Sequence, residues 1–115
     1  MPQPPPTEML QGTLDVLVLK TLSWGARHGY AIAQWLEETT DDTLRIEEGS
    51  LYPALYRMER KGWIEAEWGM SELGRKAKFY QLTPAGRTRL KAEAAAWRRF
   101  SGAVTKVLST DPGRA

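Results

Sequence analysis

Residues 49–61 carry side chains that can contact nucleic acid, all on one side of a predicted helix. The apolar residues Leu51, Leu55 and Met58 recur at helical spacing and predict a buried face. The side chains left to face outward belong to Ser50, Tyr52, Pro53, Tyr56, Arg57 and Arg60. Tyrosine and serine hydroxyls contact phosphates, and arginine reads guanine edges. The pattern favours a helix that enters a DNA groove, although an ordinary amphipathic helix with a solvated polar face would show it too.

A β-hairpin is predicted directly after this helix. Residues 63–69 alternate apolar and acidic side chains, which is the period of a half-buried strand, and the β-prone residues 77–83 form its expected partner. The sequence GMSELGRK between them is too long for a two-residue turn. We therefore expect an extended hairpin tip with charge at its end.

Charge is distributed unevenly along the 115 residues, whose formal net charge is +2. Residues 1–69 contain 6 Lys or Arg and 11 Asp or Glu, whereas residues 70–115 contain 10 and 3. The basic half begins at the predicted hairpin tip. This asymmetry indicates a polyanionic partner, although basic C-terminal halves also occur for solubility.

Several classes of function lack the residues they require. The chain has no cysteine, which excludes disulfides, thiolate zinc sites and cysteine nucleophiles. The single histidine, His28, is expected to be a structural or capping residue rather than a pH sensor, and the acidic residues 37–48 are interpreted as a solvated face rather than a metal site. No nucleophile–base pair or phosphate-binding glycine loop is present. We expect no enzyme activity, no metal and no cofactor.

Nothing in the sequence predicts contact with a membrane. No apolar run approaches the ~18–20 residues of a membrane span. The N-terminal sequence MPQPPPTE has neither the basic nor the apolar region of a signal peptide. We expect a cytoplasmic protein that makes no membrane contact.

The order of elements predicts a mainly α fold with a small β-hairpin, namely a winged helix-turn-helix followed by a C-terminal dimerisation helix. Residues 1–8 are expected to be a disordered arm because of their prolines. Residues 9–83 form the winged-helix domain, in which Ser50 is the expected N-cap of the third helix. Residues 84–108 form the last helix, with Thr83 as N-cap and Pro84 in the first turn. Residues 109–115 are a tail.

Two helices have more apolar surface than one small domain needs. The first helix is apolar on more than one side, which is typical of a helix with a second partner such as another subunit. The last helix repeats apolar residues at steps of three and four, as in a coiled-coil seam. We interpret it as a dimerisation helix, the alternative being packing within one subunit. The residues expected at a dimer or effector interface are Leu14, Val18, Leu90, Ala94, Trp97, Phe100 and Val104.

Trp97 lies in the middle of that seam. At a two-fold axis it would approach its symmetry mate, and two facing indoles could hold a small planar aromatic effector. Simple packing is the alternative role for an aromatic residue on such a seam.

The chain resembles the PadR family of bacterial transcriptional regulators. The motifs that carry the resemblance, which covers about residues 9–100, are LQGTLDVLVLKTL, HGYAIAQWL, GSLYPALYRMERKGWIEAEW and KFYQLTPAGRTRL. They most resemble the short members, which have a single C-terminal helix. The resemblance implies a winged-helix DNA-binding domain, a homodimer built through the first and last helices, and repression at a pseudo-palindromic operator that a small molecule often relieves.

The family's groove-reading helix corresponds to residues 49–61. Ser50, Tyr52, Tyr56 and Arg57 are its expected DNA-facing side chains, with Arg57 as the expected base reader. The wing corresponds to about residues 70–78, where Arg75, Lys76 and Lys78 are expected at phosphates or in the minor groove. Glu72 departs from this pattern because it would repel phosphate unless it pointed away.

The resemblance therefore implies double-stranded DNA and a second copy of the chain as partners, with association with the nucleoid when DNA is bound. The main alternative is a winged helix that serves as a protein-interaction module without an operator of its own. Binding to double-stranded RNA is a weaker alternative because the major groove of A-form RNA is too narrow for a helix.

Overall fold

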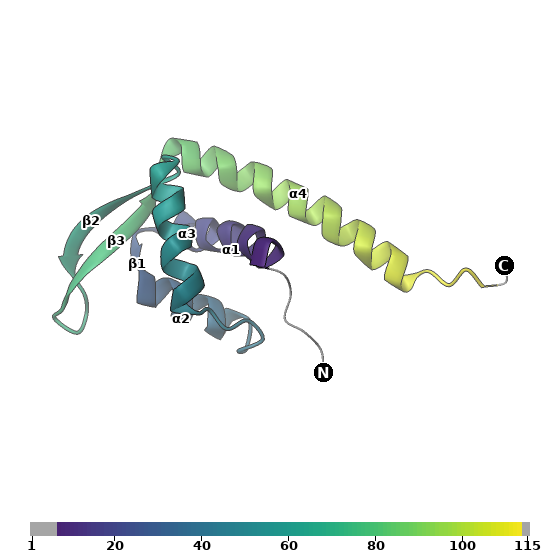
Figure 1. Ribbon diagram of the computed structural model, residues 1–115, viewed down its shortest axis with the longest axis horizontal. Coiled ribbons are helices and arrows are strands. Elements are labelled where there is room, and N and C mark those ends of the chain that lie inside the picture. The colour runs from purple at the N-terminus through teal and green to yellow at the C-terminus, as the bar shows by residue number, and fades with distance from the viewer. Residues whose placement is uncertain (1–6, 114–115) are drawn as a thin grey trace.

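Helices form most of the fold, and a small sheet lies at one end (Figure 1). The computed structural model describes residues 7–113, so most of the predicted N-terminal arm lies outside the described residues. The elements in chain order are α1 (Thr7–Thr21), the short 3-10 helix η1 (Leu22–Trp24), β1 (Arg27–His28), α2 (Gly29–Thr39), α3 (Glu48–Arg60), β2 (Ile64–Met70), β3 (Lys76–Leu82) and α4 (Pro84–Ser109). Because α1 begins at Thr7, the helix includes the last two residues of that arm.

One core holds α1, α2 and α3 together and reaches the sheet. Leu51, Leu55 and Met58 of α3 are fully buried, which confirms the apolar face predicted for this helix. The core also takes in residues from the other elements, namely Leu14, Val18, Leu19, Leu22, Ile32, Leu36, Ala54, Ile64, Tyr80 and Leu82. The helix-turn-helix is therefore positioned from its buried side, which leaves the opposite side of α3 free.

The sheet has three antiparallel strands in the order β1-β3-β2, one more than the predicted hairpin. The additional strand, β1, pairs Arg27 with Tyr80 and His28 with Phe79. A strand of two residues has no periodicity of its own, so sequence patterning does not detect it. It attaches the start of α2 to the hairpin.

His28 caps α2, as expected of a structural residue. Its backbone is extended, and its Nδ1 accepts a hydrogen bond from the amide of Ala31 at 3.2 Å. Its ring also meets the ring of Phe79 edge-on, with centroids 5.2 Å apart. One side chain thus joins the helix-turn-helix to the sheet.

The prediction that Ser50 caps α3 was wrong. The helix begins at Glu48 with Glu47 as N-cap, and Ser50 lies inside the first turn, where its amide donates to the carbonyl of Glu47 at 3.0 Å. Pro53 is the sixth residue of α3 and therefore lies beyond the first turn, where its ring removes the amide that would otherwise donate to the carbonyl of Gly49.

The junction between the hairpin and α4 is tightly fixed. Thr83 is the N-cap of α4, and its hydroxyl accepts from the amide of Gly86 at 3.0 Å and donates to the carbonyl of Gly62 at 2.6 Å. A Cβ at Gly86 would lie 1.9 Å from the carbonyl oxygen of Trp63. Only glycine fits there, so α4 leaves the domain in one direction.

Candidate nucleic-acid interface

The free side of α3 presents polar and aromatic groups to solvent. Ser50, Tyr52, Pro53, Tyr56 and Arg60 line this side, and 62% of Tyr56 is accessible. The guanidinium of Arg60 lies over the ring of Tyr56, 5.8 Å from its centroid. A guanidinium held on an aromatic face keeps its edge donors free for a base or a phosphate.

Tyr52 is held in place by the start of α2. A Cβ at Gly29 would lie 2.8 Å from both Cε1 and the hydroxyl oxygen of Tyr52, so the ring passes over the one residue of α2 that has no side chain. Sequence reasoning did not identify Gly29 as part of the site. Its only signal is a glycine at the start of a helix, directly after the N-cap residue.

Arg57 is placed differently from its expected position on the outward face. Its guanidinium donates to the carboxylate of Asp15 in α1, and only 27% of its side chain is accessible. Arg57 therefore ties α3 to α1, and base reading by this side chain would require the ion pair to open. Burial raises the pKa of Asp15 above its ordinary value of 3.8, and the hydrogen bond from Arg57 offsets part of that rise.

The wing is a hairpin with a shorter tip than predicted. Each strand keeps its predicted length but lies one residue closer to the tip than predicted, so only residues 71–75 connect the two strands. The amide of Gly74 donates to the carbonyl of Ser71 at 2.9 Å, and Gly74 has a φ of +74°, which favours glycine. This closed turn presents Glu72 and Leu73 at the tip, with Leu73 81% exposed.

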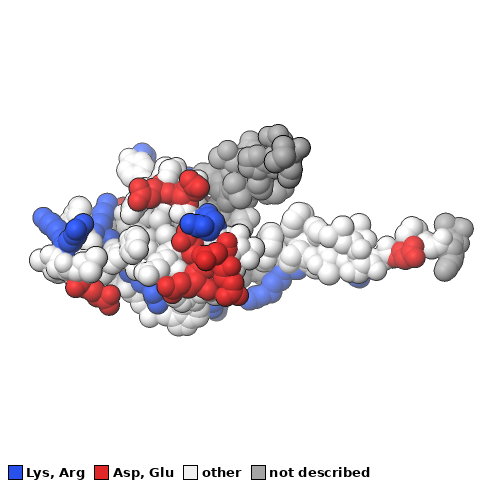
Figure 2. All heavy atoms as spheres, turned by 90° about the horizontal axis from the view of Figure 1, so that it is seen from below, with Lys and Arg blue, Asp and Glu red and all other residues white. Residues whose placement is uncertain are grey.

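The basic residues of the wing differ in solvent exposure and in whether they form an ion pair. Arg75 and Lys76 are exposed, and the ammonium of Lys76 lies 5.4 Å from the centroid of the Trp68 ring. Lys78 is half-buried and pairs with Glu59 of α3 at 3.4 Å. This pair fixes the wing beside α3, and basic side chains gather at that end of the molecule (Figure 2).

The residues expected at a dimer or effector interface fall into two groups. Val18 is fully buried in the core of one subunit, so the prediction that it faces a second subunit was wrong. Leu14 belongs to the same core, but it also lines a groove that is open to solvent. Leu90 is half-buried and packs against the same core, and Ala94 is half-buried as well.

The other group is exposed on α4. It comprises Trp97, Phe100 and Val104, together with Val107 and Leu108 further along the helix. The rings of Trp97 and Phe100 lie 6.1 Å apart. The second half of α4 projects away from the rest of the chain (Figure 1). A long apolar stripe on a projecting helix is typical of a surface that another chain covers.

The other four tryptophans are exposed or half-buried. Trp24 and Trp68 are exposed, and Trp35 and Trp63 are half-buried. Trp24 packs against Trp35 with ring centroids 5.2 Å apart.

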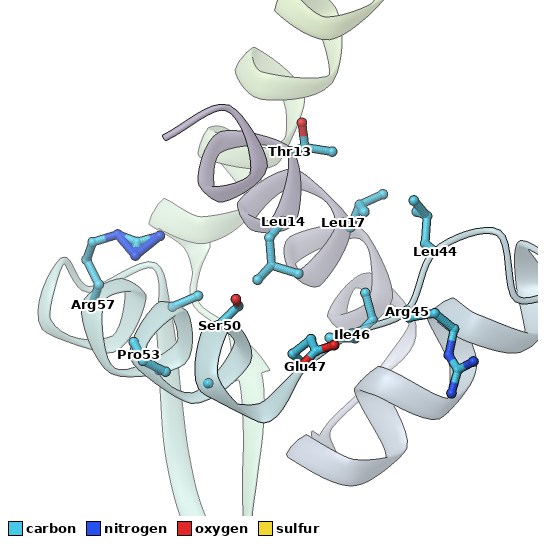
Figure 3. Close-up of a pocket in the computed structure, with 12 residues that line it drawn as sticks. Thr13, Leu14, Leu17, Leu44, Arg45, Ile46, Glu47, Ser50, Pro53 and Arg57 are labelled. Carbon is cyan, nitrogen blue, oxygen red and sulfur yellow. The ribbon is translucent and has the colours of Figure 1, made fainter. Parts of the chain in front are cut away.

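A groove lies between α1, the loop that joins α2 to α3, and the first half of α3, and it shares Ser50 and Pro53 with the free side of α3 (Figure 3). Its volume is about 270 Å³. We call it the α1–α3 groove. It is lined by Thr13, Leu14, Leu17, Leu44, Arg45, Ile46, Glu47, Gly49, Ser50, Pro53, Ala54 and Arg57.

The described residues offer neither a cluster of metal ligands nor a membrane span. Within residues 7–113, no three histidine or acidic side chains are grouped so that they could hold a metal ion. No helix in the same range is both long enough and apolar enough to cross a membrane.

Comparison with known proteins supports the resemblance seen in the sequence. The sequence model of the "Transcriptional regulator PadR-like family" matches residues 18–92. An uncharacterised protein of Lysinibacillus sphaericus is 32% identical over 91 residues, which cover 79% of this chain and 84% of the relative.

Solved structures show the same fold over nearly the whole chain. A PadR-like transcriptional regulator from Bacillus cereus is 31% identical, with a TM-score of 0.76 over 90% of this chain and 99% of the other. A transcriptional regulator from Clostridium thermocellum is 28% identical, with a TM-score of 0.77 over 86% of this chain and 96% of the other.

Proposed function

The chain belongs to the PadR-like family of transcriptional regulators, and we propose that it binds double-stranded DNA as a homodimer and represses transcription at a pseudo-palindromic operator. The observation that carries this proposal is the exposed polar face of α3 beside an exposed basic wing. Tyr56 and Arg60 lie on the first, and Arg75 and Lys76 on the second. Hydroxyl and guanidinium groups on a helix suit the major groove, and basic groups on a hairpin suit the flanking phosphates.

The dimer would supply the second recognition helix. Two copies of α3 related by a two-fold axis reach successive major grooves when they lie about 34 Å apart. We propose that α4 (Pro84–Ser109) is the dimerisation helix, because its apolar residues from Trp97 to Leu108 are exposed in the single chain. The pseudo-palindrome follows from this symmetry.

A small planar aromatic molecule is the proposed effector. Trp97 is 47% exposed, and its ring lies near that of Phe100 on the same helix face. Two indoles meeting at the two-fold axis would bind a flat ring between them by stacking. Quenching of tryptophan fluorescence by planar aromatics, lost in Trp97→Phe, would support this part of the proposal. Equal quenching in the variant would contradict it.

The test of DNA binding is a gel shift with the DNA upstream of the protein's own gene, at low and high salt and with random DNA as competitor. We expect binding that random DNA does not displace and that weakens as salt rises, because lysine and arginine contacts release counterions from the phosphates. Lys76→Ala should weaken the complex, whereas Lys91→Ala, which removes an exposed charge from α4, should not. Binding no tighter than that to random DNA would contradict an operator at this site and favour a protein-interaction module.

A further inference from the structure

One side of α4 carries only basic charge. The helix contains six basic residues but a single acidic one, Glu93, whose carboxylate pairs with Arg89. The other five basic residues fall within about a third of the helix circumference, because the chain completes a turn about every 3.6 residues. We call them the basic stripe, and they are Arg87, Lys91, Arg98, Arg99 and Lys106.

The basic stripe is exposed, and its charge is uncompensated. All five residues are exposed, and none of their side chains makes an ion pair within residues 7–113. Arg87 and Lys91 are four positions apart, a spacing at which like charges destabilise a helix. A bound polyanion would replace this repulsion with attraction.

Small residues lie between the cations of the stripe. Ala95 and Gly102 are on the same side of the helix, and no atom lies within 4 Å of a Cβ built on Gly102. Glycine inside a helix costs up to ~1 kcal/mol relative to alanine, and packing against the described residues gives no reason for it here. A glycine without such a reason is typical of a place where a partner approaches the backbone closely.

The stripe faces away from the recognition helix. The other side of α4 packs on the domain core through Leu90. Burial raises the pKa of Asp15, and the charge of Glu93 on that side of α4 adds to the rise. Because Asp15 binds Arg57 of α3, this is the side of α4 that is turned toward α3. Figure 2 shows basic side chains along one edge of the projecting helix, apart from those of the wing.

Phosphate is the group that best fits this stripe. Guanidinium and ammonium groups form charge-assisted hydrogen bonds to phosphate oxygens. The stripe contains no aromatic or large aliphatic residue, which a helix needs to insert into lipid or to anchor a protein partner. The exposed apolar residues of α4 lie on another side of the helix and belong to the proposed dimer interface. Contact with phosphates alone is how proteins bind DNA independently of its sequence.

We propose that the basic stripe of α4 binds a second DNA duplex independently of its sequence, while α3 and the wing hold the first. This inference rests on the proposed DNA-binding homodimer and adds a second surface to it. Each subunit contributes one stripe, because dimerisation through the apolar side of α4 leaves the basic side in solvent. A dimer bound at its operator would thus hold a distant DNA segment beside that operator.

A two-duplex capture assay tests this surface. A biotinylated duplex with the DNA upstream of the protein's own gene is fixed on beads and loaded with protein, and a fluorescent random duplex is added after washing. We expect the wild type to retain the fluorescent duplex at low salt and to release it as salt rises. For the same amount of protein on the beads, Arg98→Gln/Lys106→Gln should retain roughly fivefold less, because two phosphate contacts are lost. Its affinity for the first duplex should be unchanged.

The matched control removes the same charge from another part of the surface. Lys20→Gln/Arg45→Gln takes one exposed cation from α1 and one from the α2–α3 loop, and it should capture as much fluorescent duplex as the wild type. The comparison also excludes capture by the second recognition helix of the dimer, since that route would work equally well in both variants. Circular dichroism checks that both variants fold.

Photo-cross-linking locates the second duplex on the helix. The chain has no cysteine, so Gly102→Cys carries a photoactivatable group at a single position within the stripe. Illumination should attach this group to the fluorescent duplex. The same group on Glu38→Cys, at an exposed acidic position of α2, should not become attached. Equal attachment at both positions would contradict the location.

The outcomes separate this inference from the proposed function. A wild type that binds neither duplex would contradict DNA binding by this chain, and this inference with it. A wild type that holds the first duplex but captures no second one would overturn the stripe as a DNA-binding surface and nothing else, as would a stripe variant that captures as much as the wild type. Stripe-dependent binding to vesicles rich in anionic lipid, without capture of a second duplex, would also overturn it and would make a membrane the partner of α4.

Discussion

Arg57 of α3 donates a hydrogen bond to the carboxylate of Asp15 in α1, and both side chains are largely buried. The recognition helix is therefore tied to the first helix of the domain by an ion pair. Within the chain, α1 also lies beside α4. A shift of α1 would thus act on α3 through this pair as well as through the core.

The burial of Asp15 makes stability depend on pH in a defined direction. Burial raises the pKa of Asp15 above 3.8, so the folded chain holds this proton more tightly than the unfolded chain. The stability that this gives is fully present below pH 3.8 and is lost as pH rises through the raised folded pKa. Asp15→Asn lacks this titration. We therefore expect the wild type to lose stability relative to the variant as pH rises.

Urea unfolding of both proteins from about pH 3 to pH 7 measures this difference in the free energy of unfolding. A difference that stays constant over the whole range would contradict a raised pKa for Asp15.

Gly86 should tolerate no side chain. Gly86→Ala places a Cβ 1.9 Å from the carbonyl oxygen of Trp63, so α4 must move. Overpacking of this kind costs ~1–3 kcal/mol or more. The matched control is Gly102→Ala in the same helix, where no atom lies within 4 Å of the new Cβ.

We expect the control to gain up to ~1 kcal/mol from the higher helix propensity of alanine. Thermal and urea unfolding distinguish the two variants. Equal stability of both would show that the junction at Trp63 is not tight.

The cap of α2 should contribute measurably to stability. His28→Ala removes the acceptor for the amide of Ala31 and should cost ~1 kcal/mol, the usual value of an N-cap. His28→Asn retains an acceptor but loses the ring contact with Phe79, so it should lie between the wild type and the alanine variant. Alanine and asparagine variants of equal stability would assign the contribution of His28 to the ring alone.

The two parts of the proposed interface should differ in what they recognise. Because Arg57 is held by Asp15, we expect Arg60 to read bases from the exposed face of α3. Arg60→Ala should then lose ~1–3 kcal/mol of discrimination between operator and random DNA. Lys76→Ala should weaken binding to all sequences alike and reduce the salt slope by about one. Titrations of both variants with operator and random duplexes at several salt concentrations check this. Equal effects on the two DNAs in both variants would contradict the division of roles.

Sequence patterning predicted the helices because their apolar residues repeat over many positions. The buried face of α3 is an example, since Leu51, Leu55 and Met58 are spaced for one side of a helix. The cap at Thr83 was predictable for a related reason, because Thr-Pro at the start of a helix is a local signal.

Contacts between distant segments could not be predicted in this way. Asp15 and Arg57 are 42 positions apart, and no local sequence pattern around either residue indicates that the two form an ion pair. Helical spacing places Arg57 on the outward face of α3, but its long side chain reaches Asp15 of α1. Val18 was wrongly assigned to the dimer interface. The sequence pattern shows that a face of α1 is apolar, but it does not show whether that face is covered by its own domain or by another subunit. β1 was missed because two residues are too few for a pattern.

Selection of binding sites from a random duplex library tests the central claim most directly, since the operator sequence does not have to be known. The purified protein is incubated with the library, and the bound fraction is sequenced over several rounds. The proposed dimer predicts an enriched inverted repeat whose half-sites lie about one helical turn, ~10 bp, apart. The same selection with Tyr56→Ala/Arg60→Ala should lose that enrichment. If the DNA selected by the wild-type protein stays as random as the starting library, sequence-specific DNA binding by this chain would be contradicted.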